Sequence, residues 1–126
     1  MARLRIIVAD DNPAFLRELI SLLTAEFEVV ATAADGKSAL DLIRRYKPDL
    51  VVLDLAMPIL NGIELTRELA KHSPSVVICS VETDPEIVEA ARQVGALGYV
   101  FKVRVKKDLI LAVKSAVQGR PFVSPS

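Results

Sequence analysis

The sequence is dominated by short apolar segments that alternate with longer segments whose apolar residues recur at helical spacing. A short, continuous apolar run indicates a strand that is buried on both faces, as in a parallel sheet covered by helices. The predicted strands are Leu4–Ala9, Val29–Ala31, Leu50–Leu53, Val76–Cys79 and Gly98–Phe101. This alternation restricts the chain to an α/β fold with helices on both sides of a parallel sheet.

Capping residues and prolines mark where the intervening helices begin and end. Asn12-Pro13 and Asp84-Pro85 each place a capping side chain before a proline at the first helical position. The predicted helices run from Pro13 to about Thr24, from the Asp35-Gly36 turn to just before Pro48, from Ile63 to about Lys71, from Pro85 to a stop at Gly95, and from about Lys106 to Gln118. We therefore predict a doubly wound, flavodoxin-like α/β domain with five helices and a five-stranded parallel sheet of order 2-1-3-4-5.

Length and charge limit the number of domains and the kinds of partner. A chain of 126 residues with 52% hydrophobic content has room for one core. We expect the domain to span residues 1–119, and residues 120–126 to begin a linker or C-terminal tail. The 16 basic and 16 acidic residues cancel, so we expect no direct binding of nucleic acid and no attraction to a membrane surface.

Cysteine content and the N-terminal segment indicate the compartment. The single cysteine, Cys79, lies in an apolar run, so we expect a small core residue in a reducing, cytoplasmic protein. Asp10 and Asp11 interrupt the apolar run that begins at Ile6, so this segment is too short for a signal peptide or a membrane span.

Polar residues stand where the predicted strands end. Asp10-Asp11 follow the first strand, Asp54 the third, Ser80 the fourth and Lys102 the fifth. The carboxyl ends of parallel strands share one edge of the sheet, and ligands of such folds bind where the winding reverses, here between strands one and three. We therefore expect these groups to converge in one cleft.

Three neighbouring carboxylates need a cation, because each raises the pKa of the others unless the charge is neutralised. Mg²⁺ fits best, since it needs few protein carboxylates and leaves positions open for phosphate oxygens. A nucleotide or flavin site is disfavoured, because the segment from Asp10 to Pro13 offers negative charge and lacks a backbone donor at Pro13.

These residues resemble the receiver domains of two-component response regulators over nearly the whole chain. The matching motifs are the acid pair Asp10-Asp11, Asp54 followed by Met57-Pro58 and Gly62, Ser80, and the stretch GALGYVFK that ends at Lys102. Together, in this order and spacing, they are far more specific than any one of them. Gly119 followed by FVSP also resembles the subfamily in which a helix-turn-helix output domain follows the receiver.

The resemblance implies a role for each site residue. Asp54 is the phosphoacceptor for a sensor histidine kinase, Lys102 binds the phosphate, Ser80 is the switch hydroxyl and Tyr99 the aromatic switch. On phosphorylation we expect Ser80 to move toward Asp54 and the Tyr99 ring to turn inward. The alternative is that Tyr99 is a partly buried strand residue with a hydrated hydroxyl.

The resemblance also implies a ligand set for Mg²⁺. Asp11, Asp54 and the backbone carbonyl of Ala56 hold the ion, and Asp10 acts through water. We expect assisted self-phosphorylation and self-dephosphorylation rather than enzymatic turnover.

Two alternatives remain open from sequence. An aspartate-nucleophile Mg²⁺ phosphatase commonly has a second acid two residues after the nucleophile, where this chain has Ala56. The second alternative is a protein-binding module that acts without phosphorylation. It stays open because two positions depart from the family pattern. Val103 replaces a common proline, which affects the path of the following loop, and Val81 replaces a small residue and can narrow access to Asp54.

Apolar residues outside the expected core faces suggest partner surfaces. Val88, Ile110 and Val117 belong to the face formed by the fourth helix, fifth strand and fifth helix, and we expect a homodimer there that phosphorylation strengthens. Phe15 and Leu22 form a second stripe on the first helix, which is either a partner surface or the edge of a wide buried face.

Overall fold

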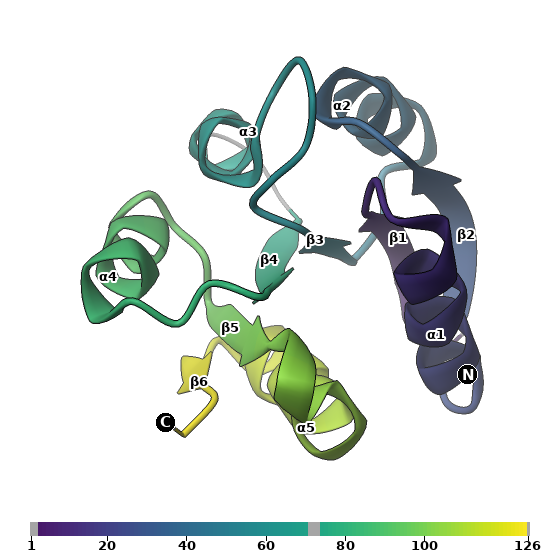
Figure 1. Cartoon of the computed structure of the whole chain (residues 1–126). Helices are drawn as coiled ribbons and strands as arrows, with labels where there is room; N and C mark the ends of the chain where they lie inside the picture. The colour runs from purple at the N-terminus through teal and green to yellow at the C-terminus, as the bar shows by residue number, and fades with distance from the viewer. Residues whose placement is uncertain (1–2, 71–73, 126) are drawn as a thin grey trace.

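A computed structural model describes residues 3–70 and 74–125, and within them one parallel sheet lies between two layers of helices (Figure 1). The strands are β1 (Arg5–Ala9), β2 (Glu28–Ala33), β3 (Leu50–Leu53), β4 (Ser75–Ser80), β5 (Gly98–Phe101) and β6 (Phe122–Val123). Their order is β2-β1-β3-β4-β5-β6. The predicted order 2-1-3-4-5 is confirmed, and the segment expected to be a tail adds a short sixth strand beside β5.

The α-helices of the described residues lie where the sequence predicts them, and side chains cap the starts of α1 to α4 but not of α5. They are α1 (Pro13–Thr24), α2 (Gly36–Tyr46), α3 (Gly62–Leu69), α4 (Pro85–Gln93) and α5 (Val105–Val117). Asn12 and Asp84 accept from backbone N–H groups of the first turns of α1 and α4, and Asn61 and Glu64 form the capping box of α3. A 3₁₀ turn, η1 (Lys102–Arg104), joins β5 directly to α5.

Each face of the sheet has its own buried cluster. One lies under α2, α3 and α4 and includes Ile7, Val51 and Ile78, while the other lies under α1 and α5 and includes Val8 and Val52. Because helices cover both faces, successive strand residues are all buried. Cys79 is fully buried, as expected, and burial raises the pKa of its thiol to about 12.

Some residues expected at the surface belong to the core. Val88 of α4 is 8% exposed and packs with Ala91 under the helix, so its assignment to a partner face is wrong. Ile110 is partly buried, whereas Val117 is 45% exposed. Phe15 and Leu22 pack against the cluster under α1 and α5, as the edge of a wide buried face.

The predicted end of the third helix at Lys71, and the neighbouring His72, lie outside the described residues. Among the helices of the described part, none has the length and apolar character needed to cross a membrane.

Candidate functional site

Three carboxylates meet at the carboxyl ends of β1 and β3. Oxygens of Asp10, Asp11 and Asp54 lie within 4.8 Å of one another. Strand pairing places them there, because Ala9 is opposite Leu53 and the N–H of Asp54 donates to the carbonyl of Ala9 at 2.9 Å. The convergence expected from parallel strand ends is therefore confirmed for the acids.

Asp10 is the most deeply buried of the three acids. Its Oδ1 accepts from the N–H of Asn12 at 2.8 Å. Its Oδ2 forms an ion pair with Lys102 at 2.9 Å but accepts no well-directed hydrogen bond from the described residues. A buried carboxylate oxygen without such a hydrogen bond is incompletely satisfied. This favours binding of a further positive group or a water molecule at Oδ2 of Asp10.

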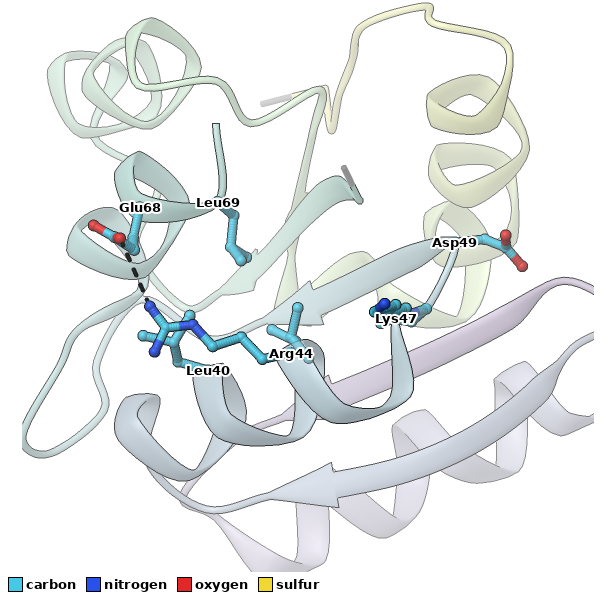
Figure 2. A pocket seen from close by; sticks show the side chains of 8 residues that line it. Leu40, Arg44, Lys47, Asp49, Glu68 and Leu69 are labelled. Atoms are coloured by element: carbon cyan, nitrogen blue, oxygen red, sulfur yellow. Dashed lines mark ion pairs between the residues drawn. The ribbon is translucent and has the colours of Figure 1, made fainter. Parts of the chain in front are cut away.

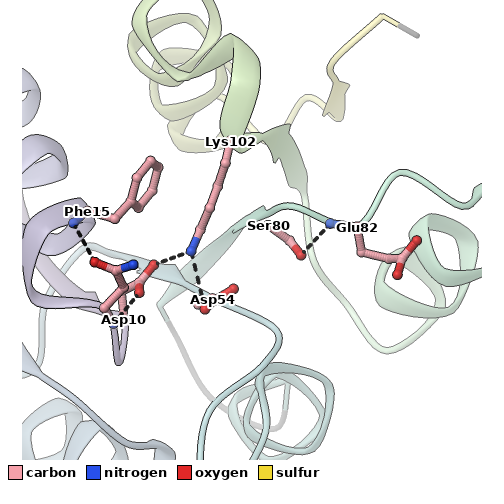
Figure 3. A network of polar contacts seen from close by, with 7 residues as sticks. Asp10, Phe15, Asp54, Ser80, Glu82 and Lys102 are labelled. Carbon is pink, nitrogen blue, oxygen red and sulfur yellow. Dashed lines mark hydrogen bonds and ion pairs between the residues drawn. The ribbon is translucent and has the colours of Figure 1, made fainter.

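Lys102 connects β5 to the acids (Figure 3). Its Nζ lies 2.9 Å from Oδ2 of Asp10 and 3.4 Å from Oδ2 of Asp54. Burial alone would lower the pKa of Lys102, but the close contact with Asp10 and the charge of Asp54 outweigh it and raise that pKa. Lys102 is thus a fixed ammonium group between two carboxylates.

Phe15 of α1 covers the same ammonium group. Nζ of Lys102 lies 4.4 Å from the centre of the Phe15 ring, a cation–π distance. Sequence reasoning placed Phe15 on an apolar stripe but missed this contact, because it depends on how the turn after β5 directs Lys102 toward α1.

Asp54 is buried and crowded by negative charge. Burial, and then the charge of Asp10, raise the pKa of its carboxyl, while Lys102 acts to lower it. The raised pKa shows that the ionised carboxylate is held in an unfavourable environment, so it gains from any additional cation that approaches.

The loop after β3 fixes the backbone of Asp54. The N–H of Gly62 donates to the carbonyl of Leu55 at 2.9 Å. A Cβ atom on Gly62 would overlap the carbonyl oxygen of Asp54, so only glycine lets α3 begin this close to the strand end. Between them, Ile59 has a φ of 73° and is exposed, which marks a strained turn.

Ser80 and Tyr99 are linked through the loop that follows β4. The Ser80 hydroxyl accepts from the N–H of Glu82 at 3.0 Å, and the Tyr99 hydroxyl donates to the carbonyl of Glu82 at 2.8 Å. The Tyr99 ring is fully buried, and burial raises the pKa of its hydroxyl. The hydrated alternative for Tyr99 is therefore wrong, and its ring already lies inward in this structure.

Glu82 was missed by sequence reasoning, because it takes part through main-chain atoms, which carry no sequence signal. The side chain of Ser80 is buried beside the strand end, as the strand pattern indicates.

Comparisons with known proteins agree with this geometry. A family model described as the response regulator receiver domain matches residues 6–114. The chain belongs to the response regulator receiver domain family. It is 37% identical to the transcriptional regulatory protein DegU of Brevibacillus brevis over 98% of this chain and 54% of that protein.

Solved structures of response regulators are also similar to this chain. A LuxR-family two-component response regulator from Aurantimonas sp. SI85-9A1 has a TM-score of 0.92 at 32% identity, covering 98% of this chain and 91% of that one. The receiver domain of the response regulator NarL from Mycobacterium tuberculosis has a TM-score of 0.90 at 31% identity, covering 95% and 100%. The chain spans only 54% and 59% of the first curated relatives, DegU and NarL.

The acidic cluster of this receiver domain suits a hard divalent cation. Asp11 is exposed beside the buried Asp10 and Asp54, so a cation can reach the cluster from solvent. All three donors are carboxylates, which Mg²⁺ prefers, and the incompletely satisfied Oδ2 of Asp10 points to the same conclusion. Ala56 is exposed next to Asp54, and its N–H helps to lower the pKa of Asp54.

The two departures from the family pattern lie in exposed loops of the receiver domain. Val103 is 90% exposed in η1, so the chain passes from β5 to α5 through a 3₁₀ turn without a proline. Val81 is 74% exposed directly after β4. Its effect on access to Asp54 stays a prediction.

Proposed function

We propose that this receiver domain accepts a phosphoryl group on Asp54 from a phosphohistidine of a sensor histidine kinase. The observation that carries the proposal is the Lys102 ammonium held 3.4 Å from Asp54 and 2.9 Å from Asp10. A carboxylate oxygen of Asp54 attacks the phosphorus, the phosphorus–nitrogen bond breaks, and the released imidazole nitrogen takes a proton from solvent. Asp54 becomes a mixed anhydride that water later hydrolyses.

Asp11, Asp54 and the carbonyl of Ala56 would hold Mg²⁺, with Asp10 acting through a water molecule. When bound, Mg²⁺ neutralises the carboxylates and the charge that develops on the transferring phosphoryl group. The support is the close approach of three carboxylates and the incompletely satisfied Oδ2 of Asp10.

Lys102 and Ser80 are the groups that recognise the bound phosphoryl group. Lys102 exchanges its contact with Asp54 for a phosphoryl oxygen, and the Ser80 hydroxyl donates to another. Converting a two-state domain from about 1:99 to 99:1 requires roughly 5.5 kcal/mol, and two such bonds contribute about 1.5–3 kcal/mol each. These two contacts therefore come close to supplying the switching energy.

The signal leaves the site through Ser80, Glu82 and Tyr99. A movement of Ser80 toward Asp54 breaks its bond to the N–H of Glu82 and so disturbs the carbonyl that holds the Tyr99 hydroxyl. NMR of the Tyr99 ring with a beryllofluoride phosphate mimic tests this, because Ser80→Ala should remove the response of the ring. An equal response in both proteins would exclude Ser80 as the link.

The output is a change on the face formed by α4, β5 and α5. We propose a homodimer that phosphorylation strengthens and, in a longer protein, regulation of transcription through a helix-turn-helix output domain. In this proposal residues 1–119 are the receiver and 120–126 begin a linker, of which Phe122–Val123 pair with β5. DegU and NarL, of which this chain covers 54% and 59%, are named as transcriptional regulatory proteins. Sedimentation before and after phosphorylation should differ at equal concentration.

Intact mass after incubation with Mg²⁺ and a small acyl phosphate tests the central proposal. The chain should gain one phosphoryl group, and Asp54→Asn should gain none. A phosphorylation-independent binding module would gain none in either form. A phosphatase would hydrolyse phosphate esters continuously, which this proposal does not expect.

A further inference from the structure

The turn that carries Lys102 is tied at its far end to a buried carboxylate. Arg104, the last residue of η1, donates from Nε to Oδ2 of Asp108 at 2.8 Å and from Nη2 to Oδ1 at 3.5 Å. Asp108 lies in the first turn of α5 and is 4% exposed. The exit from the Lys102 turn is therefore fixed to α5.

The near end of the same turn is tied to the same carboxylate through Ser124. The N–H of Phe101, the residue before Lys102, donates to the Ser124 hydroxyl at 3.0 Å. That hydroxyl in turn donates to Oδ2 of Asp108 at 2.7 Å. Ser124 is 3% exposed, so this chain of bonds is shielded from water.

Strand pairing delivers Ser124 to this position. The N–H of Phe122 donates to the carbonyl of Leu97, and the N–H of Ser124 donates to the carbonyl of Tyr99, both at 2.9 Å. Burial alone would raise the pKa of Asp108, but hydrogen bonds from Arg104 and Ser124 outweigh it and lower that pKa. The acceptor at the centre of the network is thus a stable carboxylate.

We propose that Ser124 and Asp108 are positioning residues for Lys102, holding both ends of its turn so that the ammonium reaches Asp10 and Asp54. Because the backbone of the turn is already fixed, holding Nζ between two carboxylates costs only the rotamer entropy of the lysine side chain. Small displacements of a group that contacts the transferring phosphoryl group have large effects on rate. The inference rests on the proposed function of Asp54 and Lys102.

The proposal makes the Ser124 side chain, carried by the segment 122–124 that follows α5, part of the phosphorylation apparatus. Any contact that draws this segment away from β5 also frees the Phe101 end of the Lys102 turn. The chemistry at Asp54 is then sensitive to what binds the segment after α5.

A double-mutant cycle in the full 126-residue chain separates positioning from general stability. Ser124→Ala should slow phosphorylation of Asp54 by acyl phosphate by about tenfold. Val123→Ala, a neighbouring exposed change that keeps the backbone pairing, should leave the rate unchanged. In a Lys102→Ala background the Ser124 change should have no further effect. An equal slowing in both backgrounds, or no slowing at all, overturns the proposal.

NMR relaxation of the Lys102 Cε methylene tests, without phosphorylation, whether Ser124 positions the Lys102 side chain. Ser124→Ala should increase the mobility of this group and leave the exposed Lys106 unchanged. If Ser124→Ala does not fold, Arg104→Gln releases the other end of the turn and should have the same effect. Unchanged Lys102 mobility overturns the positioning role. Absence of phosphorylation in the unsubstituted chain instead counts against the proposed function.

Discussion

The two edges of the sheet differ in how they hold charge. At the carboxyl edge, the largely buried Lys102 ammonium lies 2.9 Å from the buried carboxylate of Asp10 and 3.4 Å from that of Asp54. At the amino edge, a pocket of about 540 Å³ lies between the ends of α2 and α3 (Figure 2). Its ion pair, Arg44 with Glu68, is 3.9 Å long with side chains 64% and 41% exposed.

The charged groups that line this pocket therefore interact more weakly than those at the carboxyl edge. Exposed charges at the amino edge are hydrated and screened, so their mutual interaction contributes little. Buried charges at the carboxyl edge are poorly hydrated, so each one strongly changes what its neighbours bind. We infer that function follows the burial and convergence of charge rather than the volume of a pocket.

The largest expected effect is on phosphorylation after removal of Lys102. Lys102→Ala should slow phosphoryl transfer to Asp54 by about 100-fold, because it deletes a buried cation that contacts the developing charge. Quenched time courses read by intact mass measure the rate. Lys106→Ala, an exposed change on α5, is the matched control, and equal rates in the two variants would contradict the assigned role of Lys102.

A smaller effect, on the free energy of unfolding, is expected from substitution of Asp54. Its pKa is raised in the folded protein, so the folded state binds more protons than the unfolded state and stability falls as pH rises through that pKa. Asp54→Asn should therefore stabilise the fold near neutral pH, by on the order of 1 kcal/mol. The gain should vanish at pH values below the ordinary carboxyl pKa.

Urea unfolding at several pH values measures this difference. Asp35 provides the contrast, because hydrogen bonds from Ser38 lower its pKa and stabilise the charged form as the cap of α2. Asp35→Ala should therefore destabilise the fold near neutral pH. A destabilising Asp54→Asn would show that the site is not under electrostatic strain.

The smallest effect is expected at the amino edge. Arg44→Gln removes an exposed ion pair, so unfolding free energy should change by less than about 0.5 kcal/mol. The phosphorylation rate should stay the same. A slower rate in this variant would show that the two edges are coupled and that their contrast is not functional.

Sequence alone predicted the parts of the site that follow from strand ends. Asp10, Asp54 and Lys102 converge because parallel strands end at one edge, and a pattern of apolar runs is enough to locate those ends. The full burial of the Tyr99 ring could not be predicted from the sequence. Strand alternation gives the side of the sheet, whereas the position of the ring depends on the carbonyl of Glu82 in a loop.

The remaining differences have tertiary causes. β6 has too few residues to show any period, and its pairing with β5 becomes favourable only once α5 returns the chain to the sheet. The sequence pattern placed Val88 at the surface. The width of the buried face of α4 depends on packing against α3 and β5, which the sequence pattern does not show. The Ser124–Asp108 contact joins residues whose closeness no local pattern indicates.

Chemical trapping of the phosphorylated residue tests the central claim most directly. The chain is treated with Mg²⁺ and acyl phosphate and then with borohydride, which reduces an aspartyl phosphate to homoserine, and peptide sequencing by mass spectrometry locates the product. We predict homoserine at position 54, and none there without acyl phosphate. Homoserine at position 10 or 11 instead, or a phosphoryl group that resists reduction, would contradict Asp54 as the phosphoacceptor.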